Sequence, residues 1–277
     1  MRYISFRRPS GEPSFGRLDG HGCVVDLAGP SGGSLGDALR AGDLQQRPAG
    51  ATLALADVVQ LPLITDPSKI ICVGLNYATH VAETGREQKE HPAIFTRWAD
   101  TLVADGQPLV RPRASGEFDY EGELAVIIGK AGRVIPADRA LKHVAGYSIF
   151  NDASARDWQK HNIQFTPGKN FPGTGALGPT LVTPDEVPDL GSQQVVTRLN
   201  GNVVQDQPVS DMIWSISEII AYVSAFTVLS PGDVIATGTP GGVGAKRQPP
   251  LWMKAGDLVE VEIGVLGKLT NRVIDEQ

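Results

Sequence analysis

Glycine and proline are spread along the whole chain, and they limit which regular elements it can form. The 277 residues include 32 glycines and 20 prolines, which are not confined to a low-complexity segment. Glycine accepts the positive φ angles of tight turns, whereas proline ends helices and is excluded from central strands. The distribution therefore favours many strands joined by tight turns. Because 41% of the residues are hydrophobic, the chain can also bury a sizeable core.

Short apolar runs between turn residues predict the strands. They lie at 2–6, 16–19, 23–27, 69–74, 124–128, 144–150, 180–183, 195–199, 234–237 and 258–263. Asn200-Gly201 stands between two of these runs and predicts a hairpin with a type I′ turn. Helices are expected at 34–39, 77–83, 154–161 and 213–226. Because strands dominate and do not alternate regularly with helices, we predict a mixed β fold with a few peripheral helices (α+β).

A linker is predicted at residues 61–67. Pro62 and Pro67 prevent a regular element there. We therefore expect a small N-terminal β domain at residues 1–66 and a larger domain at residues 67–277.

The charge and the cysteine content exclude several classes of protein. A net charge of −6 argues against a sequence-independent nucleic-acid binder, which needs a basic stripe. No run approaches the roughly 18 apolar residues of a membrane helix, and no apolar signal segment is found near Met1, so we expect no membrane association. Two cysteines, Cys23 and Cys72, do not make a disulfide framework, so we expect a cytoplasmic, reducing setting.

Three carboxylates carry the strongest chemical signal. Glu121 and Glu123 precede and enter a buried strand, where alternation places them on one face, and Asp119 could join them. Asp152 ends the next apolar run along the chain. Taken singly, the Glu pair fits a solvated edge strand and Asp152 fits a helix cap. Together, the three carboxylates suit Mg²⁺ or Mn²⁺.

Such a site would need extra cations to bind an anionic substrate. Three carboxylates and one divalent ion leave a negative charge, and Lys169 and Arg97 are the candidate cations. The glycine-rich segment 173–178 spells a dinucleotide-binding pattern, but Pro179 follows it at once and no helix can begin there. We therefore do not predict a nucleotide cofactor.

Four motifs together resemble the fumarylacetoacetate hydrolase family, in the family's order, across residues 68–277. They are Gly74-Leu-Asn-Tyr-Ala-Thr-His-Val-Ala-Glu83, Asp119-Tyr-Glu-Gly-Glu-Leu-Ala-Val126, Asn151-Asp152 with Ala155-Arg156-Asp157, and Gly238-Thr-Pro-Gly-Gly-Val-Gly244. The resemblance implies a β-sandwich roll, and the first 66 residues resemble the small N-terminal domain of longer bacterial members. It also implies a homodimer that acts on a small keto acid.

The resemblance assigns a role to each candidate residue. Metal ligation is implied for Glu121, Glu123 and Asp152. A water-activating dyad is implied for His80 and Glu83, on a lid helix that orders with substrate; without the family context, a solvated helical pair is the favoured interpretation. A catalytic role is implied for Lys169, and substrate contacts for Gln159 and Thr239. Arg97 stands where many relatives carry lysine, and we expect it to bind the substrate carboxylate.

Two outcomes of the same enolate chemistry stay open. The first is hydrolysis of a C–C bond in an acylpyruvate-like β-diketo acid, which the dyad favours. The second is decarboxylation or keto–enol isomerisation of a related keto acid of the oxaloacetate type. A binding protein without catalysis is disfavoured, because ligands, dyad and Lys169 are all present.

Overall fold

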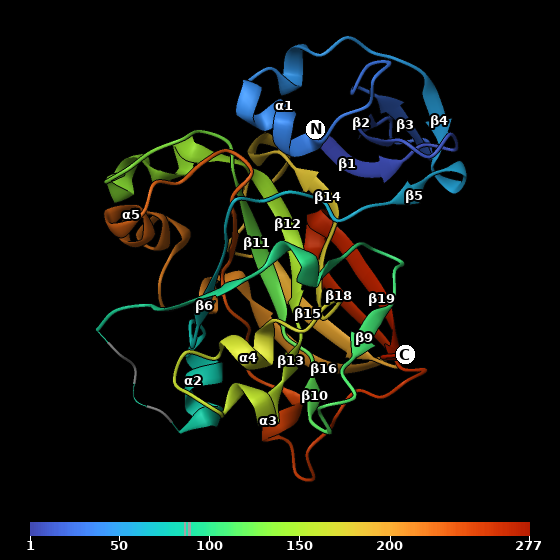
Figure 1. Ribbon diagram of the computed structural model, residues 1–277. Coiled ribbons are helices and arrows are strands. Elements are labelled where there is room, and N and C mark those ends of the chain that lie inside the picture. Colours follow the sequence, from blue (N-terminus) through green and yellow to red (C-terminus); the bar gives the residue numbers. More distant parts are fainter. Residues whose placement is uncertain (86, 88–89) are drawn as a thin grey trace.

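A large mixed sheet forms the centre of the molecule (Figure 1). The computed structural model describes residues 1–85, 87 and 90–277. The order of the main strands in this sheet is β4-β3-β2-β1-β14-β12-β11-β17-β6-β7, with β5 paired to β1 and β8 to β14. Its strands are β1 (Arg2–Arg7), β2 (Pro13–Leu18), β3 (Cys23–Asp26), β4 (Thr52–Ala54), β5 (Val59–Gln60), β6 (Ile70–Gly74), β7 (Ala93–Arg97), β8 (Leu102–Val103), β11 (Gly122–Ile128), β12 (Val144–Asp152), β14 (Gly175–Val182) and β17 (Val234–Ala236).

A second sheet packs against one face of the first. Its strands, in spatial order, are β16 (Asn202–Pro208), β15 (Gln194–Leu199), β18 (Leu258–Ile263), β19 (Gly267–Asp275) and β9 (Leu109–Arg111). A short ribbon pairs β10 (Phe118–Asp119) with β13 (Ser154–Ala155). The β15–β16 hairpin turns at Asn200 and Gly201, whose φ angles of 52° and 79° confirm the predicted type I′ turn.

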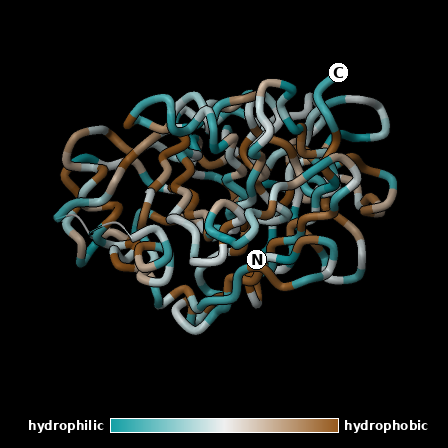
Figure 2. Tube along the Cα trace, turned by 90° about the horizontal axis from the view of Figure 1, so that it is seen from below, coloured by the Kyte–Doolittle hydropathy of each residue, from teal (hydrophilic) through white to brown (hydrophobic). Residues whose placement is uncertain are grey.

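Side-chain alternation along β11 decides which face carries the carboxylates. Leu124 and Val126 belong to the core between the two sheets, whereas Ala125 and Ile127 belong to a second core on the other face. Glu123 has the parity of Ala125 and Ile127, so it lies on the face turned away from the second sheet. In Figure 2, many outer loops are hydrophilic and hydrophobic stretches run through the interior.

The N-terminal unit continues the main sheet. Strand β1 pairs antiparallel with β14, and Tyr3 and Phe15 share one hydrophobic core with Phe150 and Leu177. Residues 61–67 contain no strand or helix, as expected for a linker, but Leu63 and Ile64 are buried. The division of the chain into two domains at residue 66 stays a prediction.

Few helices accompany the sheets, and they are short. They are α1 (Leu35–Ala41), α2 (Ala78–Thr84), α3 (Arg156–Gln159), α4 (Thr166–Lys169) and α5 (Ile216–Phe226). The 3₁₀ segments are η1 (Leu44–Gln46), η2 (Leu55–Asp57), η3 (Ala99–Thr101), η4 (Ala137–His143), η5 (Pro184–Glu186), η6 (Val209–Asp211), η7 (Gly244–Lys246) and η8 (Gly264–Leu266). The predicted fold class, mixed β with peripheral helices, is confirmed.

Side-chain caps explain where α1 and α5 begin. Ser34 caps α1, and Ser215 with Glu218 forms a capping box that starts α5 three residues later than the apolar pattern indicates. The predicted helix 154–161 is shorter in the structure, where α3 begins at Arg156 because residues 154–155 form strand β13. None of the described helices has the length and apolarity needed to span a bilayer.

Candidate metal centre and active site

Three acidic side chains meet where β11 and β12 lie side by side. Gly122 pairs with Asn151 across these antiparallel strands, and the Asp152 amide donates to the Glu121 carbonyl oxygen over 2.9 Å. Glu121, Glu123 and Asp152 each offer a carboxylate oxygen, and these oxygens lie within 4.8 Å of one another. All three residues are buried. The structure thus brings together the residues that the sequence nominated as metal ligands.

Two of these carboxylates have cationic partners. Lys169 Nζ lies 2.6 Å from both Glu121 Oε2 and Asp152 Oδ2, and Arg156 Nη2 lies 2.7 Å from Glu121 Oε1. Burial opposes the ionisation of Glu121, but Lys169 and Arg156 outweigh it and lower the pKa of Glu121 to about 2. Burial alone would lower the pKa of Lys169, but Asp152 and Glu121 raise it, so Lys169 is an ammonium.

Glu123 is the carboxylate that still needs positive charge. Within the described residues it forms no ion pair, and it accepts a hydrogen bond from the Gly238 amide over 2.8 Å. Burial raises the pKa of Glu123 well above its usual value, and the charges of Asp152 and Glu121 raise it further. A divalent cation among these hard oxygen donors would relieve both effects, so the residues present fit Mg²⁺ or Mn²⁺.

Helix α2 carries the predicted dyad. His80 Nδ1 lies 2.7 Å from Glu83 Oε1, and Glu83 Oε2 accepts from the Gly242 amide over 2.8 Å. Gly85, with φ of 67°, ends the helix. Tyr77 occupies the N-cap position of this helix, and the Asn76 side-chain amide donates to the Thr237 carbonyl.

One cavity of about 170 Å³ connects the dyad with the acidic cluster. Residues of α2, α3 and α4 help to line it, and these helices lie at the end of the molecule opposite the N-terminal unit (Figure 1). Its walls include six of the candidate residues, namely His80, Glu121, Glu123, Gln159, Lys169 and Thr239. Asp152 and Glu83 are not among the lining residues. Asp152 contacts Lys169, and Glu83 contacts His80.

Comparison with known proteins places this geometry in a family. Residues 69–274 match the family described as fumarylacetoacetate (FAA) hydrolase C-terminal. The chain belongs to the fumarylacetoacetate hydrolase family. It is 43% identical to the human "Oxaloacetate tautomerase FAHD2A, mitochondrial" over 224 residues, which cover 80% of this chain and 71% of that protein.

Solved structures of family members share the whole fold. The fumarylacetoacetate hydrolase of Exiguobacterium antarcticum superposes with a TM-score of 0.85 at 35% identity, covering all of both chains. The 5-carboxymethyl-2-hydroxymuconate delta-isomerase of Mycobacterium smegmatis gives a TM-score of 0.83 at 32% identity, again over all of both chains. The family thus includes proteins named as hydrolases, isomerases and tautomerases. The mitochondrial setting belongs to the human relative's name, and the cytoplasmic setting of this chain stays a prediction.

Arg97 lies elsewhere than the sequence analysis expected. Its guanidinium is fully buried and pairs with Asp152 Oδ1, and it also donates to the Ala153 carbonyl over 3.0 Å and to Thr174 Oγ1 over 2.6 Å. It is not among the residues that line the cavity. Arg97 therefore holds a candidate metal ligand from behind, because its guanidinium pairs with Asp152 and does not line the cavity where a substrate carboxylate would bind.

The Gly-Thr-Pro turn is hydrogen-bonded within the protein, and the expected substrate contact of Thr239 stays a prediction. Thr239 donates its hydroxyl proton to the Gly122 carbonyl over 3.0 Å and accepts from Gln205 Nε2 over 2.8 Å. Its hydroxyl is therefore occupied within the protein, although the residue lines the cavity. The amides of Gly238 and Gly242 donate to the carboxylates of Glu123 and Glu83.

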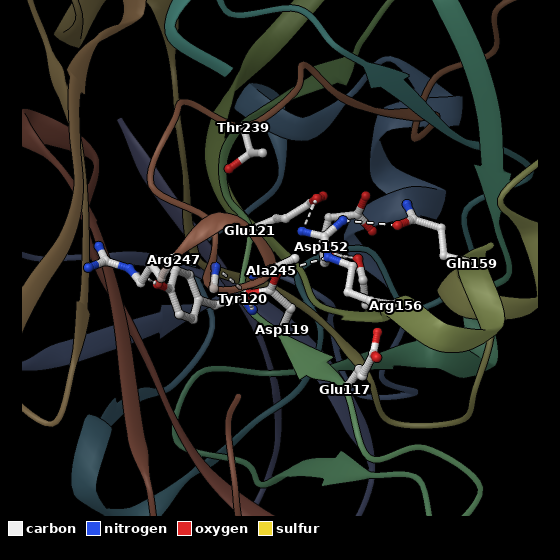
Figure 3. A network of polar contacts seen from close by, with 12 residues as sticks. Glu117, Asp119, Tyr120, Glu121, Asp152, Arg156, Gln159, Thr239, Ala245 and Arg247 are labelled. Carbon is white, nitrogen blue, oxygen red and sulfur yellow. Dashed lines mark hydrogen bonds and ion pairs between the residues drawn. The ribbon is translucent and has the colours of Figure 1, made fainter. Parts of the chain in front are cut away.

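Sequence reasoning missed Arg156 and misplaced Asp119. Arg156 lies between Asp119 and Glu121, with Gln159 beside it (Figure 3). Asp119 does not join the metal cluster; it pairs with Arg156 Nε over 2.8 Å. The spacing of Arg156 and Gln159, three residues apart on a helical turn, was the available signal for this contact.

Proposed function

We propose that this protein is a divalent-metal-dependent enzyme that interconverts the keto and enol forms of a small 2-oxo acid of the oxaloacetate type. The observation that carries the proposal is the shared cavity, in which His80 faces the same space as Glu121 and Glu123. The volume of about 170 Å³ suits a small substrate. The name of the 43% identical human relative supports this choice of reaction.

The chain's own residues would divide the work as follows. Glu121, Glu123 and Asp152 would hold the ion, which when bound supplies Lewis-acid stabilisation of the oxygen that becomes negative during enolisation. His80, oriented at Nδ1 by Glu83, would move a proton at the carbon beside the keto group with its other ring nitrogen, Nε2.

Lys169 and Gln159 would complete the substrate site. The Lys169 ammonium pairs with Glu121 and Asp152 and holds them in place, and it also lines the cavity, where it would attract the substrate carboxylate. The Gln159 side chain is half-buried in the cavity wall and would contact the same carboxylate.

Hydrolysis of a C–C bond in an acylpyruvate is the second candidate, and the dyad favours it. A histidine held by a glutamate can take a proton from water as readily as from carbon. Decarboxylation of oxaloacetate would need the same metal-stabilised enolate. The three outcomes differ in their products.

Product analysis separates them. The purified protein, treated with EDTA and then supplied with Mn²⁺, is given enol oxaloacetate and, separately, acetylpyruvate. We expect accelerated loss of the enol absorbance without pyruvate release, abolished by EDTA and restored by Mn²⁺. Rapid formation of pyruvate from acetylpyruvate would instead establish the hydrolase, and pyruvate with CO₂ from oxaloacetate the decarboxylase. Turnover that survives complete metal removal would overturn the proposal.

A further inference from the structure

Asp119 is a buried carboxylate beside the site that the proposed mechanism does not use. It ends β10, is 0% exposed, and is surrounded by donors. Its Oδ1 accepts from the Gly244 amide over 2.8 Å, and its Oδ2 accepts from the Ala245 amide over 3.0 Å and from Arg156 Nε over 2.8 Å. A charge held by this many donors has a fixed position.

Arg156 connects Asp119 to the metal site, because it contacts both Asp119 and Glu121. While Nε donates to Asp119, Nη2 lies 2.7 Å from Glu121 Oε1 and Nη1 donates to Gln159 Oε1 over 3.0 Å. The guanidinium is planar, so holding one edge on Asp119 also sets the direction of the other groups. Figure 3 shows this arrangement, with Arg156 reaching from Asp119 towards Glu121 and Gln159.

The loop 238–245 contacts Asp119 through its backbone amides. A Cβ on Gly244 would lie 2.6 Å from Asp119 Oδ1 and 1.9 Å from the Leu251 carbonyl oxygen, so only glycine fits at this point. The same loop donates amides to Glu123 and to Glu83. One backbone segment thus touches a candidate metal ligand, the dyad and Asp119.

We infer that Asp119 is a positioning residue, which anchors both the loop 238–245 and Arg156 and thereby sets Glu121 and Glu123 for metal binding. This inference rests on the proposed function, since it assigns a role toward the proposed ion. Without the Asp119 charge, Arg156 has Glu121 as its remaining anionic partner and competes with the ion for that carboxylate. An amide at position 119 keeps only one acceptor oxygen, so one of the Gly244 and Ala245 amides loses its acceptor and the loop's hold on Glu123 loosens.

The test is the affinity of the protein for Mn²⁺ alone, measured by titration calorimetry. Asp119→Asn keeps the size of the side chain but removes its charge, and we expect it to weaken Mn²⁺ binding about ten- to a hundredfold, the usual effect of losing a partner of a metal ligand. The kcat for enol oxaloacetate should fall with it, while KM changes less. Arg156→Lys, which keeps a charge near Glu121 but cannot also hold Asp119, should weaken Mn²⁺ binding in the same way.

The control is a buried, ion-paired aspartate away from the cavity. Asp233 is 0% exposed, lies 3.0 Å from Lys69 Nζ and accepts from the Ser230 amide over 2.7 Å. Asp233→Asn should lower Tm yet leave the Mn²⁺ affinity unchanged. If the wild type binds Mn²⁺ and both site variants bind it within twofold of the wild type, Asp119 is only structural and the inference is overturned. If the wild type binds no Mn²⁺, the metal site of the proposed function fails, and the inference fails with it.

Discussion

Glu121 and Glu123 are two residues apart on one face of a strand, yet their surroundings act on them in opposite directions. Lys169 and Arg156 lower the pKa of Glu121 to about 2, whereas burial and the neighbouring carboxylates raise the pKa of Glu123. The difference arises because Lys169 and Arg156 both pair with Glu121, and neither pairs with Glu123. This asymmetry is the residue-scale evidence that a further cation belongs at Glu123.

A neutral side chain at position 123 should therefore stabilise the metal-free protein. Because the folded-state pKa of Glu123 is raised, its ionisation costs stability, and the metal-free wild type should become less stable as pH rises above the unfolded pKa. Glu123→Gln should remove that loss and raise Tm at neutral pH in EDTA, by about 2–4 °C for each 1 kcal/mol gained. The same variant should lose the Tm increase that Mn²⁺ gives the wild type. Thermal scans with EDTA or Mn²⁺ across pH check both; a lower Tm in EDTA would contradict the account.

Replacing His80 should separate chemistry from binding. His80→Ala removes the proposed proton-transfer group but none of the three carboxylates, so Mn²⁺ affinity should stay within about twofold. The kcat should fall about 10²- to 10⁴-fold, the usual contribution of general acid–base catalysis. Stopped-flow kinetics with titration calorimetry measures both quantities. An unchanged kcat would show that the dyad is not used.

The contacts of individual residues were the hardest feature to predict from the sequence. The convergence of Glu121, Glu123 and Asp152 could be predicted, because strand alternation and the end of the neighbouring run are local patterns. The burial of Arg97 behind Asp152 could not, because its partners Asp152 and Thr174 lie 55 and 77 residues further along the chain. The acceptors of the loop amides were equally hidden, because a backbone donor leaves no mark in the sequence.

At the scale of elements, α2 depends on a distant segment for its position. Asp211 Oδ2 accepts from the Thr79 hydroxyl over 2.8 Å and from the Thr79 amide over 3.2 Å, and Thr79 Oγ1 accepts from the Gly241 amide over 3.1 Å. This contact supplies the helix with a cap from η6 in place of a local one.

Removing that cap should loosen the dyad but not the metal site. Asp211→Ala should destabilise the start of α2 by about 1 kcal/mol. If half or more of that is lost from the productive orientation of His80, kcat falls about two- to fivefold. The Mn²⁺ affinity should not change, because no candidate ligand lies on α2. A large loss of Mn²⁺ affinity would show instead that α2 supports the ligands directly.

The elements themselves followed the sequence where the period was clear. Strand 258–263 is predicted residue for residue as β18, and the hairpin at Asn200 was evident from its dipeptide. The helix predicted at 154–161 is confirmed only at 156–159, because residues 154 and 155 form β13, which pairs with β10, and a partner strand cannot be read from the local period.

At the scale of the whole molecule, the main sheet and one hydrophobic core run from the N-terminal unit into the larger part of the chain. Tyr3, Phe15 and Leu35 pack with Phe150 and Leu177, and β1 pairs with β14. The sequence indicated the linker through its prolines, but the long-range pairing behind it has no local signature. The homodimer expected from the family resemblance stays a prediction, which sedimentation velocity would test.

This shared core predicts one cooperative unfolding transition. Two independent domains would melt separately, whereas a continuous sheet and core should unfold together. Differential scanning calorimetry should give a single peak. Its calorimetric and van't Hoff enthalpies should agree, whether the unit that unfolds is the monomer or an intact dimer. Two resolved peaks, the first removed by deleting residues 1–66, would show that the N-terminal unit folds alone.

The central claim is that Glu121, Glu123 and Asp152 hold one divalent ion. Crystals grown with Mn²⁺ test it most directly, through an anomalous difference map collected near the manganese edge. We predict a single strong peak within bonding distance of all three carboxylates, with Lys169 beside it. A map without a peak, in which Lys169 alone fills the space between Glu121 and Asp152, would contradict the account.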